Sequence, residues 1–253
     1  MVNQSQTENA AEPVKSVSMP FLHHLEELRK RLLKCALAVI VCSGVAFYYA
    51  QYIIDYFVAP LHGVKLHVTE VTGSFMAYFK ISLVVGLLTA TPIVLYQLWS
   101  FISPGLYPSE KQKVMPVVFA STILFLGGAA FCYFLILPMA LEFLIGFSDD
   151  LFTPIITVTS YISFTGMMLL GFGLSFQLPV VAYFLGRIGI VNSGMLSRGR
   201  RIAVIIILIV SGFLTPTPDI FTQLLMAVPL YVLYELSILL VRFTGRERQT
   251  TKV

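Results

Sequence analysis

The chain has 253 residues, of which 57% are hydrophobic and only 12% are charged. A soluble domain of this length needs far more charge to cover its surface, so the composition indicates a membrane-embedded protein. The formal net charge of +4 does not indicate a nucleic-acid-binding groove, because the basic residues cluster at the ends of apolar segments.

The chain begins with a polar segment, residues 1–18, that contains Glu8 and Glu12 and no arginine. It has the pattern of neither a secretory signal peptide nor an Arg-rich transit peptide. We therefore expect a disordered cytoplasmic tail on a bacterial protein that is inserted by its own first span. Residues 244–253 are predicted to form a second cytoplasmic tail.

The next stretch, residues 21–34, has a helical pattern with one apolar and one polar arc. The apolar arc holds Phe21, Leu22, Leu25, Leu28 and Leu32. Glu27, Arg31 and His24 lie opposite, and Glu27 and Arg31 have the spacing of an i,i+4 ion pair. Arg29 falls inside the apolar arc, where it either binds a nearby carbonyl or carboxylate or extends to the membrane interface.

Six apolar segments predict an all-α polytopic membrane domain over residues 19–243. A span needs about 20 apolar residues to cross about 30 Å of hydrocarbon. The predicted spans are residues 35–54, 75–98, 114–137, 161–185, 202–214 and 220–241. The fifth span has only 13 residues and reaches about 20 Å at a rise of about 1.5 Å per residue. Either its polar flanks extend it within the protein, or the bilayer is thinner there.

The basic residues predict the orientation of these spans. Of the 17 Lys and Arg residues, all but Lys65 and Lys80 lie on the same side as both termini. Cytoplasmic loops of membrane proteins carry such an excess, so both termini are predicted to be cytoplasmic. Lys80 lies near the outer end of the second span, where its long side chain can reach the interface.

The outer connections, residues 55–74 and 138–160, contain prolines and aromatic residues, so we expect ordered caps rather than slack loops. Pro60, in the first of them, is predicted to set the shape of the chain there. The outer turn between the last two spans reads TPTPD. This turn predicts a stiff, tight hairpin with Asp219 as the N-cap of the sixth span.

The fourth span contains a polar side chain, Gln177, followed by Pro179, which can kink the helix. An amide at this depth is costly unless it is paired, so Gln177 marks either a packing contact or a functional site. Glu235, in the sixth span, is expected to pair with an arginine near the inner interface.

Glu27 and Glu110 are two carboxylates beside the membrane on the basic inner side. Each has a structural explanation, since Glu27 can pair with Arg31 and Glu110 can favour the N-terminal end of the third span. The loop that carries Glu110 also holds Trp99, Phe101, Pro104, Leu106 and Tyr107. Both carboxylates can accept hydrogen bonds from arginine, and the apolar side chains of the loop lie beside Glu110 in the sequence. Such a surface suits a peptide in which charged residues are followed by an apolar stretch.

The sequence contains no catalytic or metal-binding pattern, since its four His residues lack metal-ligand spacing and hydrolase or zincin motifs are absent. Cys35, Cys42 and Cys132 lie in apolar runs and are expected to be small packing residues. We therefore predict no enzyme activity, no cofactor and no metal. A small-solute transporter with a midplane site at Gln177, or a structural scaffold without a ligand, are the alternatives to a peptide receptor.

Four segments resemble the TatC family, the core subunit of the twin-arginine protein translocase. They are HLEELRKRLL before the first span, YQLWSFISPGLYPSEKQ after the second, FGLSFQLPV in the fourth and LTPTPD before the sixth. The resemblance, over residues 20–245, implies a cupped six-span bundle with cytoplasmic termini that binds signal peptides bearing consecutive arginines on folded precursors. It also implies transport driven by the proton-motive force, the single-span partners TatA and TatB, and a homo-oligomer within the complex.

By this resemblance, functional positions of the family map onto the chain. The signal-peptide-binding positions correspond to Glu27, Glu110, Arg29, Phe101 and Pro104, and the outer-face positions to Pro60 and Asp219. Gln177 departs from the pattern, because many family members carry Glu there. A neutral amide can neither titrate nor form a salt bridge, so hydrogen bonding to a partner or to an inserted signal peptide is what it can offer.

Overall fold

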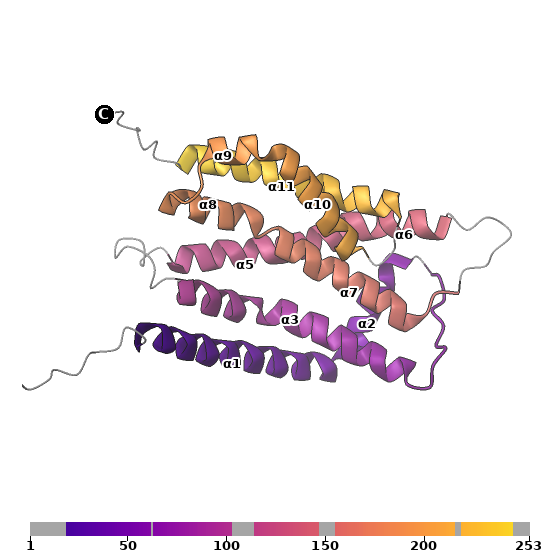
Figure 1. Cartoon of the computed structure of the whole chain (residues 1–253). Helices are drawn as coiled ribbons and strands as arrows, with labels where there is room; N and C mark the ends of the chain where they lie inside the picture. The colour runs from indigo at the N-terminus through magenta and orange to yellow at the C-terminus, as the bar shows by residue number, and fades with distance from the viewer. Residues whose placement is uncertain (1–18, 62, 103–113, 147–154, 216–218, 245–253) are drawn as a thin grey trace, which may run out of the picture.

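The computed structural model describes residues 19–61, 63–102, 114–146, 155–215 and 219–244. Within these ranges the chain is helical apart from turns and one isolated β-bridge. Figure 1 shows the long helices side by side in one bundle, with the start of α1 (Met19–Tyr48) and the end of α11 (Ile220–Thr244) at the same end. We call this the inner end and the opposite one the outer end.

The other helices of the described residues belong to the bundle and its outer cap. In chain order they are α2 (Ala50–Val58), the 3-10 turn η1 (Ala59–Leu61), α3 (Gly73–Ile102), α5 (Val114–Phe131), the π-helix η3 (Cys132–Ile136), α6 (Leu137–Gly146), α7 (Val158–Ser175), α8 (Leu178–Ile188), α9 (Ser193–Arg198) and α10 (Arg200–Leu214).

Within the described ranges, five helical stretches are long and apolar enough to cross a membrane. They are His24–Tyr48, Gly73–Ile102, Met115–Gly146, Val158–Ile188 and Ile220–Phe243. Each overlaps one predicted span, and α10 coincides with the remaining, fifth one. The predicted all-α polytopic fold is therefore confirmed, whereas the cytoplasmic location of the termini stays a prediction.

The first helix is longer than the predicted first span. α1 has 30 residues and is about 45 Å long, so the amphipathic segment 21–34 and the apolar run after it form one continuous helix. No proline occurs between residues 21 and 59 to end it earlier. The helix breaks at Tyr49, within the predicted span 35–54, and α2 resumes at Ala50.

Prolines interrupt the third and fourth spans. Pro138 lacks an N–H and its ring would meet the carbonyl four residues earlier, and the turn before it, Cys132–Ile136, is a widened π-helix. In the fourth span Pro179 occupies the first turn of α8, and Phe176 and Gln177 form the turn that separates α7 from α8. The kink predicted at Pro179 is therefore present as a break just before it.

The outer connections are ordered where the structure describes them. His67 N donates to Ile156 O at 2.9 Å, and Val158 N donates to His67 O at 3.0 Å, so the two connections pair with each other. The hydroxyl of the buried Tyr161 donates to the carbonyl of Phe57 near the end of α2. These bonds tie the predicted caps to the outer end of the bundle.

The apolar core lies mainly around α7, in whose span half of the residues are buried. Its fully buried members include Ile81, Leu137, Ile162, Phe172 and Met226. A smaller second cluster comprises Leu95, Trp99, Val118, Phe125 and Val180. The long helices after α1 are thus held together by shared apolar burial.

The first helix is attached differently, because only 6% of its apolar stretch is buried, against 39–50% in the other candidate spans. It packs closely on α3 at Gly86, where an added Cβ would lie 2.5 Å from the Cα of Ser43. Small residues at a helix crossing allow such a close approach. The exposed face of α1, with Leu37, Ile40 and Val41, is apolar and suited to lipid.

The fifth predicted span is short in the structure as well. α10 has 15 residues and is about 22 Å long, because it begins only two residues before the predicted start at residue 202. Polar flanks therefore lengthen it very little, which favours a locally thinner bilayer. We expect a spin label at the exposed Ile206 to be shallower than one at the exposed Ile40, in the apolar part of α1. If spin labels along α10 and along α1 reported the same depths, those of a bilayer of full thickness, the thinning would be contradicted.

Candidate functional site

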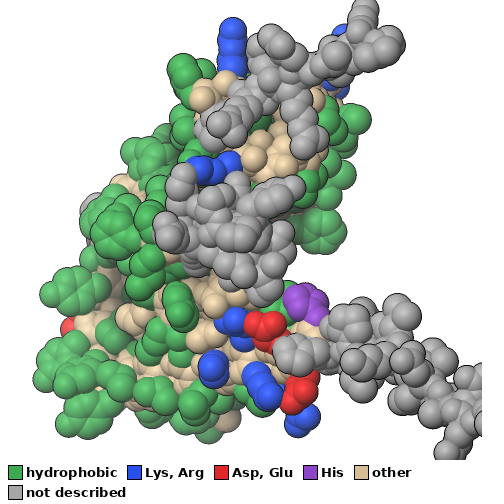
Figure 2. All heavy atoms as spheres, turned by 90° about the vertical axis from the view of Figure 1, so that its left-hand side faces the viewer, with side chains coloured by type: hydrophobic (Ala, Val, Ile, Leu, Met, Phe, Trp, Pro, Cys, Tyr) green, Lys and Arg blue, Asp and Glu red, His purple; other side chains and the backbone are tan. Residues whose placement is uncertain are grey.

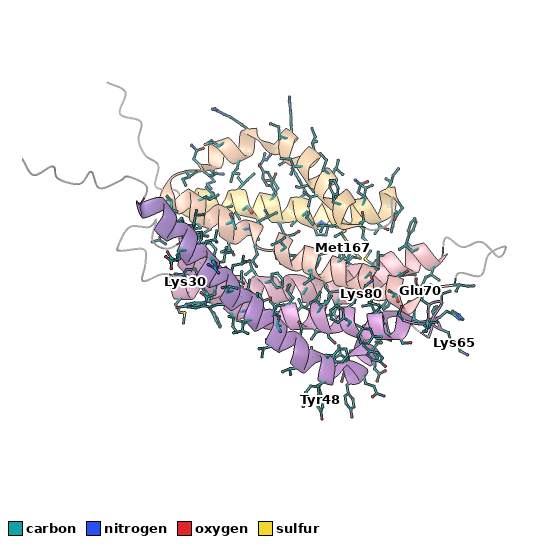
Figure 3. The ribbon with its side chains drawn as sticks, turned by 60° about the horizontal axis from the view of Figure 1, so that its bottom comes forward. Lys30, Tyr48, Lys65, Glu70, Lys80 and Met167 are labelled. Carbon is teal, nitrogen blue, oxygen red and sulfur yellow. The ribbon has the colours of Figure 1, made fainter. Side chains whose placement is uncertain are left out.

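Basic side chains gather at the inner end of the bundle. Figure 2, which looks onto this end, shows Lys and Arg side chains across it, with acidic side chains beside them in the lower part, where α1 lies. Figure 3 shows Lys30 at the inner end and Lys65 and Glu70 at the outer end. Among the described residues, the charged side chains predicted for the inner side and those predicted for the outer side, such as Lys65 and Glu70, thus lie at opposite ends of the bundle.

Glu27 lies on α1 at this inner end and pairs with Arg31 one turn later. Arg31 Nη2 and Nε donate to Glu27 Oε1 at 2.6 and 2.9 Å, which confirms the predicted i,i+4 pair. Arg31 Nη1 also donates to Gln97 Oε1 on α3 at 3.4 Å, so the pair joins the two helices. The Glu27 side chain remains 26% exposed. Its carboxylate is therefore held in place while part of it still faces solvent.

An aromatic contact lies close to this carboxylate along α1. His24, one turn before Glu27 on the same face, stacks on Phe101 of α3 with ring centroids 4.5 Å apart and planes 20° apart. Phe101 is half-buried at the end of α3. The structure therefore brings the predicted residues Glu27 and Phe101 to the same end of the α1–α3 pair. The sequence reasoning missed Gln97 and the stacking role of His24.

The arcs of α1 face in opposite directions. Leu25, Leu28 and Leu32 are exposed, whereas the Glu27 side meets α3. An outward apolar face is stable when the surroundings are lipid rather than water. Arg29 lies on this outward side, is exposed, and forms no ion pair or hydrogen bond with a residue of the described ranges. This favours the interpretation in which Arg29 extends to the membrane interface.

Two predicted binding residues, Pro104 and Glu110, lie outside the described residues, between α3 and α5. The approach of Glu110 to Glu27 therefore stays a prediction.

Gln177 takes part in a buried hydrogen-bond network. Its side chain is 8% exposed, and its Nε2 donates to the carbonyl oxygen of Ser121 on α5 at 3.0 Å. Ser121 Oγ accepts from Trp99 Nε1 on α3 at 3.0 Å, and the Trp99 ring meets Phe184 edge-on at 4.8 Å. The network joins α3, α5 and the α7–α8 break, so the packing interpretation of Gln177 is favoured. Ser121 is a small polar residue in an apolar helix, and nothing in the sequence around it predicts that it bonds to Gln177 and Trp99.

Replacing Gln177 with Leu is expected to lower the free energy of unfolding by about 1 kcal/mol, because the bond to Ser121 is lost. Thermal unfolding of the purified chain in detergent measures this. Gln223→Leu is a matched comparison, since Gln223 Nε2 donates to the Leu208 carbonyl at 2.9 Å. Solute uptake by the purified chain that disappears with Gln177→Leu would contradict a packing role.

Both predicted outer-face residues have structural roles. Asp219 Oδ1 accepts from Thr222 N at 2.6 Å, which confirms Asp219 as the N-cap of α11. Pro60 is buried in the η1 turn that follows α2. Neither position points to a ligand by itself, and both stabilise the shape of the outer end.

Two other charged residues are paired. Glu235 on α11 binds Arg200 at the start of α10, with Oε1 2.8 Å from Nε, as the sequence predicted for an arginine near the inner interface. Lys80 donates to Ser163 Oγ on α7 at 2.8 Å and so bonds to a neighbouring helix within the protein. Figure 3 labels Lys80 on α3 in the outer half of the bundle.

The described residues contain no group of three or more His, Cys, Asp or Glu side chains placed to hold a metal ion. The three cysteines are free: Cys132 is buried in the π-helix, and Cys35 and Cys42 are partly buried on α1. Their positions fit the predicted role as small packing residues.

Comparison with known proteins gives consistent matches over most of the chain. The family model of the Sec-independent protein translocase protein TatC matches residues 23–229. TatC of Campylobacter jejuni is 41% identical over 226 residues, which cover 87% of this chain and 92% of that protein. TatC of Aquifex aeolicus is 39% identical over 237 residues, which cover 91% and 98%.

A solved structure gives the same answer for the fold. A crystal structure of the twin arginine translocase receptor TatC superposes with a TM-score of 0.80 at 40% sequence identity, covering 87% of this chain and 99% of that one. Sequence and fold therefore agree over most of the chain. The chain belongs to the TatC family of Sec-independent protein translocase proteins, which are membrane transport proteins rather than enzymes.

Proposed function

We propose that this chain is the receptor subunit that binds twin-Arg signal peptides of folded precursors at the cytoplasmic face of the bacterial inner membrane. One observation carries the proposal. At the inner end of a TatC-family chain, the Glu27 carboxylate is fixed by Arg31 while 26% of its side chain stays exposed. A preoriented, partly desolvated carboxylate is a strong acceptor for an incoming guanidinium.

The surroundings of Glu27 support selection of arginine. A guanidinium can form two parallel hydrogen bonds with one carboxylate, whereas a lysine ammonium acts as a point charge. The many Lys and Arg residues of the same end repel a generic basic peptide, so a carboxylate among them adds selectivity. We propose that Glu110 supplies the second acceptor, and that Arg29, Phe101 and Pro104 flank the peptide.

The apolar part of a signal peptide needs an apolar path. His24 lies on α1, one turn before Glu27, and stacks on Phe101 at the end of α3. The apolar stretch of a signal peptide can begin to pack on these two rings. We propose that the peptide continues from there along the bundle into the membrane.

Further subunits complete the proposed system. From the family resemblance we propose that the proton-motive force drives transport, and the sequence contains no nucleotide-binding loop. The apolar outer surfaces of the spans can contact lipid or single-span helices, and we propose TatA, TatB and further copies of this chain as partners. Gln177 uses one N–H for Ser121, so its second N–H and its carbonyl oxygen are the groups that can bond to such a partner.

The test compares two peptides of equal charge on the purified full chain in detergent. A peptide with two consecutive arginines before an apolar stretch is expected to bind at least roughly tenfold more tightly than its twin-Lys counterpart, because one lost charge-assisted hydrogen bond costs about 1.5–3 kcal/mol. Fluorescence anisotropy of labelled peptides gives both dissociation constants. Equal affinities would show that the site reads charge alone and would refute the arginine-reading function.

A further inference from the structure

A polar pocket lies at the inner end, between α9, α10 and α11 and separate from the Glu27 site on α1. Its volume is about 260 Å³, and it is lined by Ser193, Gly194, Ser197, Arg200, Glu235, Ile238, Leu239 and Arg242. A pocket of this size suits a small headgroup rather than a large organic ligand.

The charges of this pocket favour an anion. Arg200 binds Glu235 through both carboxylate oxygens, with Nε 2.8 Å from Oε1 and Nη2 2.9 Å from Oε2. The Tyr231 hydroxyl donates to Glu235 Oε1 at 3.0 Å. Glu235 is thus neutralised within the protein, while Arg200 keeps further N–H donors, since a guanidinium has five.

Arg242 supplies the excess positive charge. It is exposed at the end of α11 and forms no ion pair or hydrogen bond with a residue of the described ranges. Two arginines against one glutamate give the pocket a net charge of +1. The hydroxyls of Ser193 and Ser197 add neutral donors on the α9 side, so the lining resembles a phosphate-binding surface.

The remaining wall distinguishes a lipid from a free anion. Ile238 and Leu239 lie beside the charged residues, and Leu239 is exposed on a helix that spans the membrane. A free phosphate gains nothing from an apolar wall, whereas a phospholipid places its headgroup among the arginines and its acyl chains against that wall. Basic pockets between helices on the cytoplasmic side are suited to anionic headgroups.

We propose that the pocket between α9, α10 and α11 binds the headgroup phosphate of an anionic phospholipid. A bound headgroup would contact both the start of α10 and the end of α11 and so hold these two ends together. It would also fix the short α10 at the level of the headgroups. We expect this site to act independently of peptide recognition, because its residues lie on α9, α10 and α11, whereas Glu27 lies on α1.

The test measures lipid retention by the full chain in detergent, using native mass spectrometry during titration with phosphatidylglycerol or with phosphatidylcholine of the same acyl chains. Arg242→Gln is expected to weaken phosphatidylglycerol binding roughly fivefold, about the factor of one basic residue near an anionic surface. Arg201→Gln is the matched control: Arg201 is exposed one residue after Arg200 and does not line the pocket. Arg201→Gln is expected to leave phosphatidylglycerol binding unchanged. Retention of phosphatidylcholine is expected to be unchanged in both variants.

Three outcomes would overturn the proposal. Unchanged phosphatidylglycerol binding in Arg242→Gln would remove the pocket from lipid recognition. Equal losses in Arg242→Gln and Arg201→Gln would assign binding to diffuse surface charge. Competition by glycerol phosphate as effective as that by the intact lipid would make it a site for free anions. Unchanged thermal unfolding of both variants confirms that the comparison concerns folded protein.

Discussion

Replacing Glu27 with Gln is expected to weaken twin-Arg peptide binding by roughly tenfold to a hundredfold, because a lost charge-assisted hydrogen bond costs about 1.5–3 kcal/mol. The substitution keeps the shape of the side chain but removes its charge, so Arg31 is left without its anion and repels the peptide. Fold stability should change by only about 0.3–0.5 kcal/mol, the usual value of an i,i+4 pair on a helix surface. Adding Glu110→Gln should weaken binding further.

The neighbouring Glu26 provides a matched control. Glu26 lies one residue away on α1, pairs with Lys30 at 2.8 Å, and is 61% exposed. Glu26→Gln removes the same charge at the same end but on a different face of the helix, so binding of the peptide should change little. Equal losses from Glu26→Gln and Glu27→Gln would mean that net charge, and not the fixed carboxylate of Glu27, attracts the peptide.

The close crossing of α1 and α3 is expected to be highly sensitive to added volume. A Cβ on Gly86 would lie 2.5 Å from Ser43 Cα and 2.6 Å from its backbone nitrogen, so no rotation of a side chain relieves the contact. Gly86→Ala should therefore force the helices apart and cost about 1–3 kcal/mol, as overpacking of a well-packed site does. Because α1 buries so little elsewhere, peptide binding at Glu27 should fall together with stability.

Two glycines provide controls for this prediction. An added Cβ at Gly44, next to Ser43 on α1, or at Gly127 on α5 has no heavy atom within 4 Å. Gly44→Ala and Gly127→Ala should therefore leave thermal unfolding unchanged or raise its midpoint, since Ala favours helix over Gly. A Gly86→Ala variant as stable as these two would show that α1 can move away from α3 without loss.

The parts of the site that sequence predicted are those encoded by local spacing. The Glu27–Arg31 pair follows from a separation of four residues, and the Asp219 cap from its place directly before an apolar run. The spans themselves follow from uninterrupted apolar length, including the short α10. In each case neighbouring residues alone determine the structure.

Contacts between helices were not predictable in this way. The pairing of Arg31 with Gln97, and of Gln177 with Ser121, joins residues 66 and 56 positions apart. The sequence shows that Gln177 needs a partner but not which helix supplies it. The orientation of α1 could not be predicted for a related reason. Apolar residues can face either the lipid or the protein, so the pattern of apolar and polar residues does not predict which face of α1 packs on α3.

The central claim, that the inner end of α1 and α3 binds the signal peptide, is tested most directly by site-specific crosslinking. A photoreactive phenylalanine analogue is placed at Phe101, beside His24, or at the exposed Tyr48, at the other end of α1. We predict that a twin-Arg peptide crosslinks to position 101 and not to position 48, and that Glu27→Gln removes the product. Crosslinking at position 48 alone, or at position 101 irrespective of Glu27, would contradict the account.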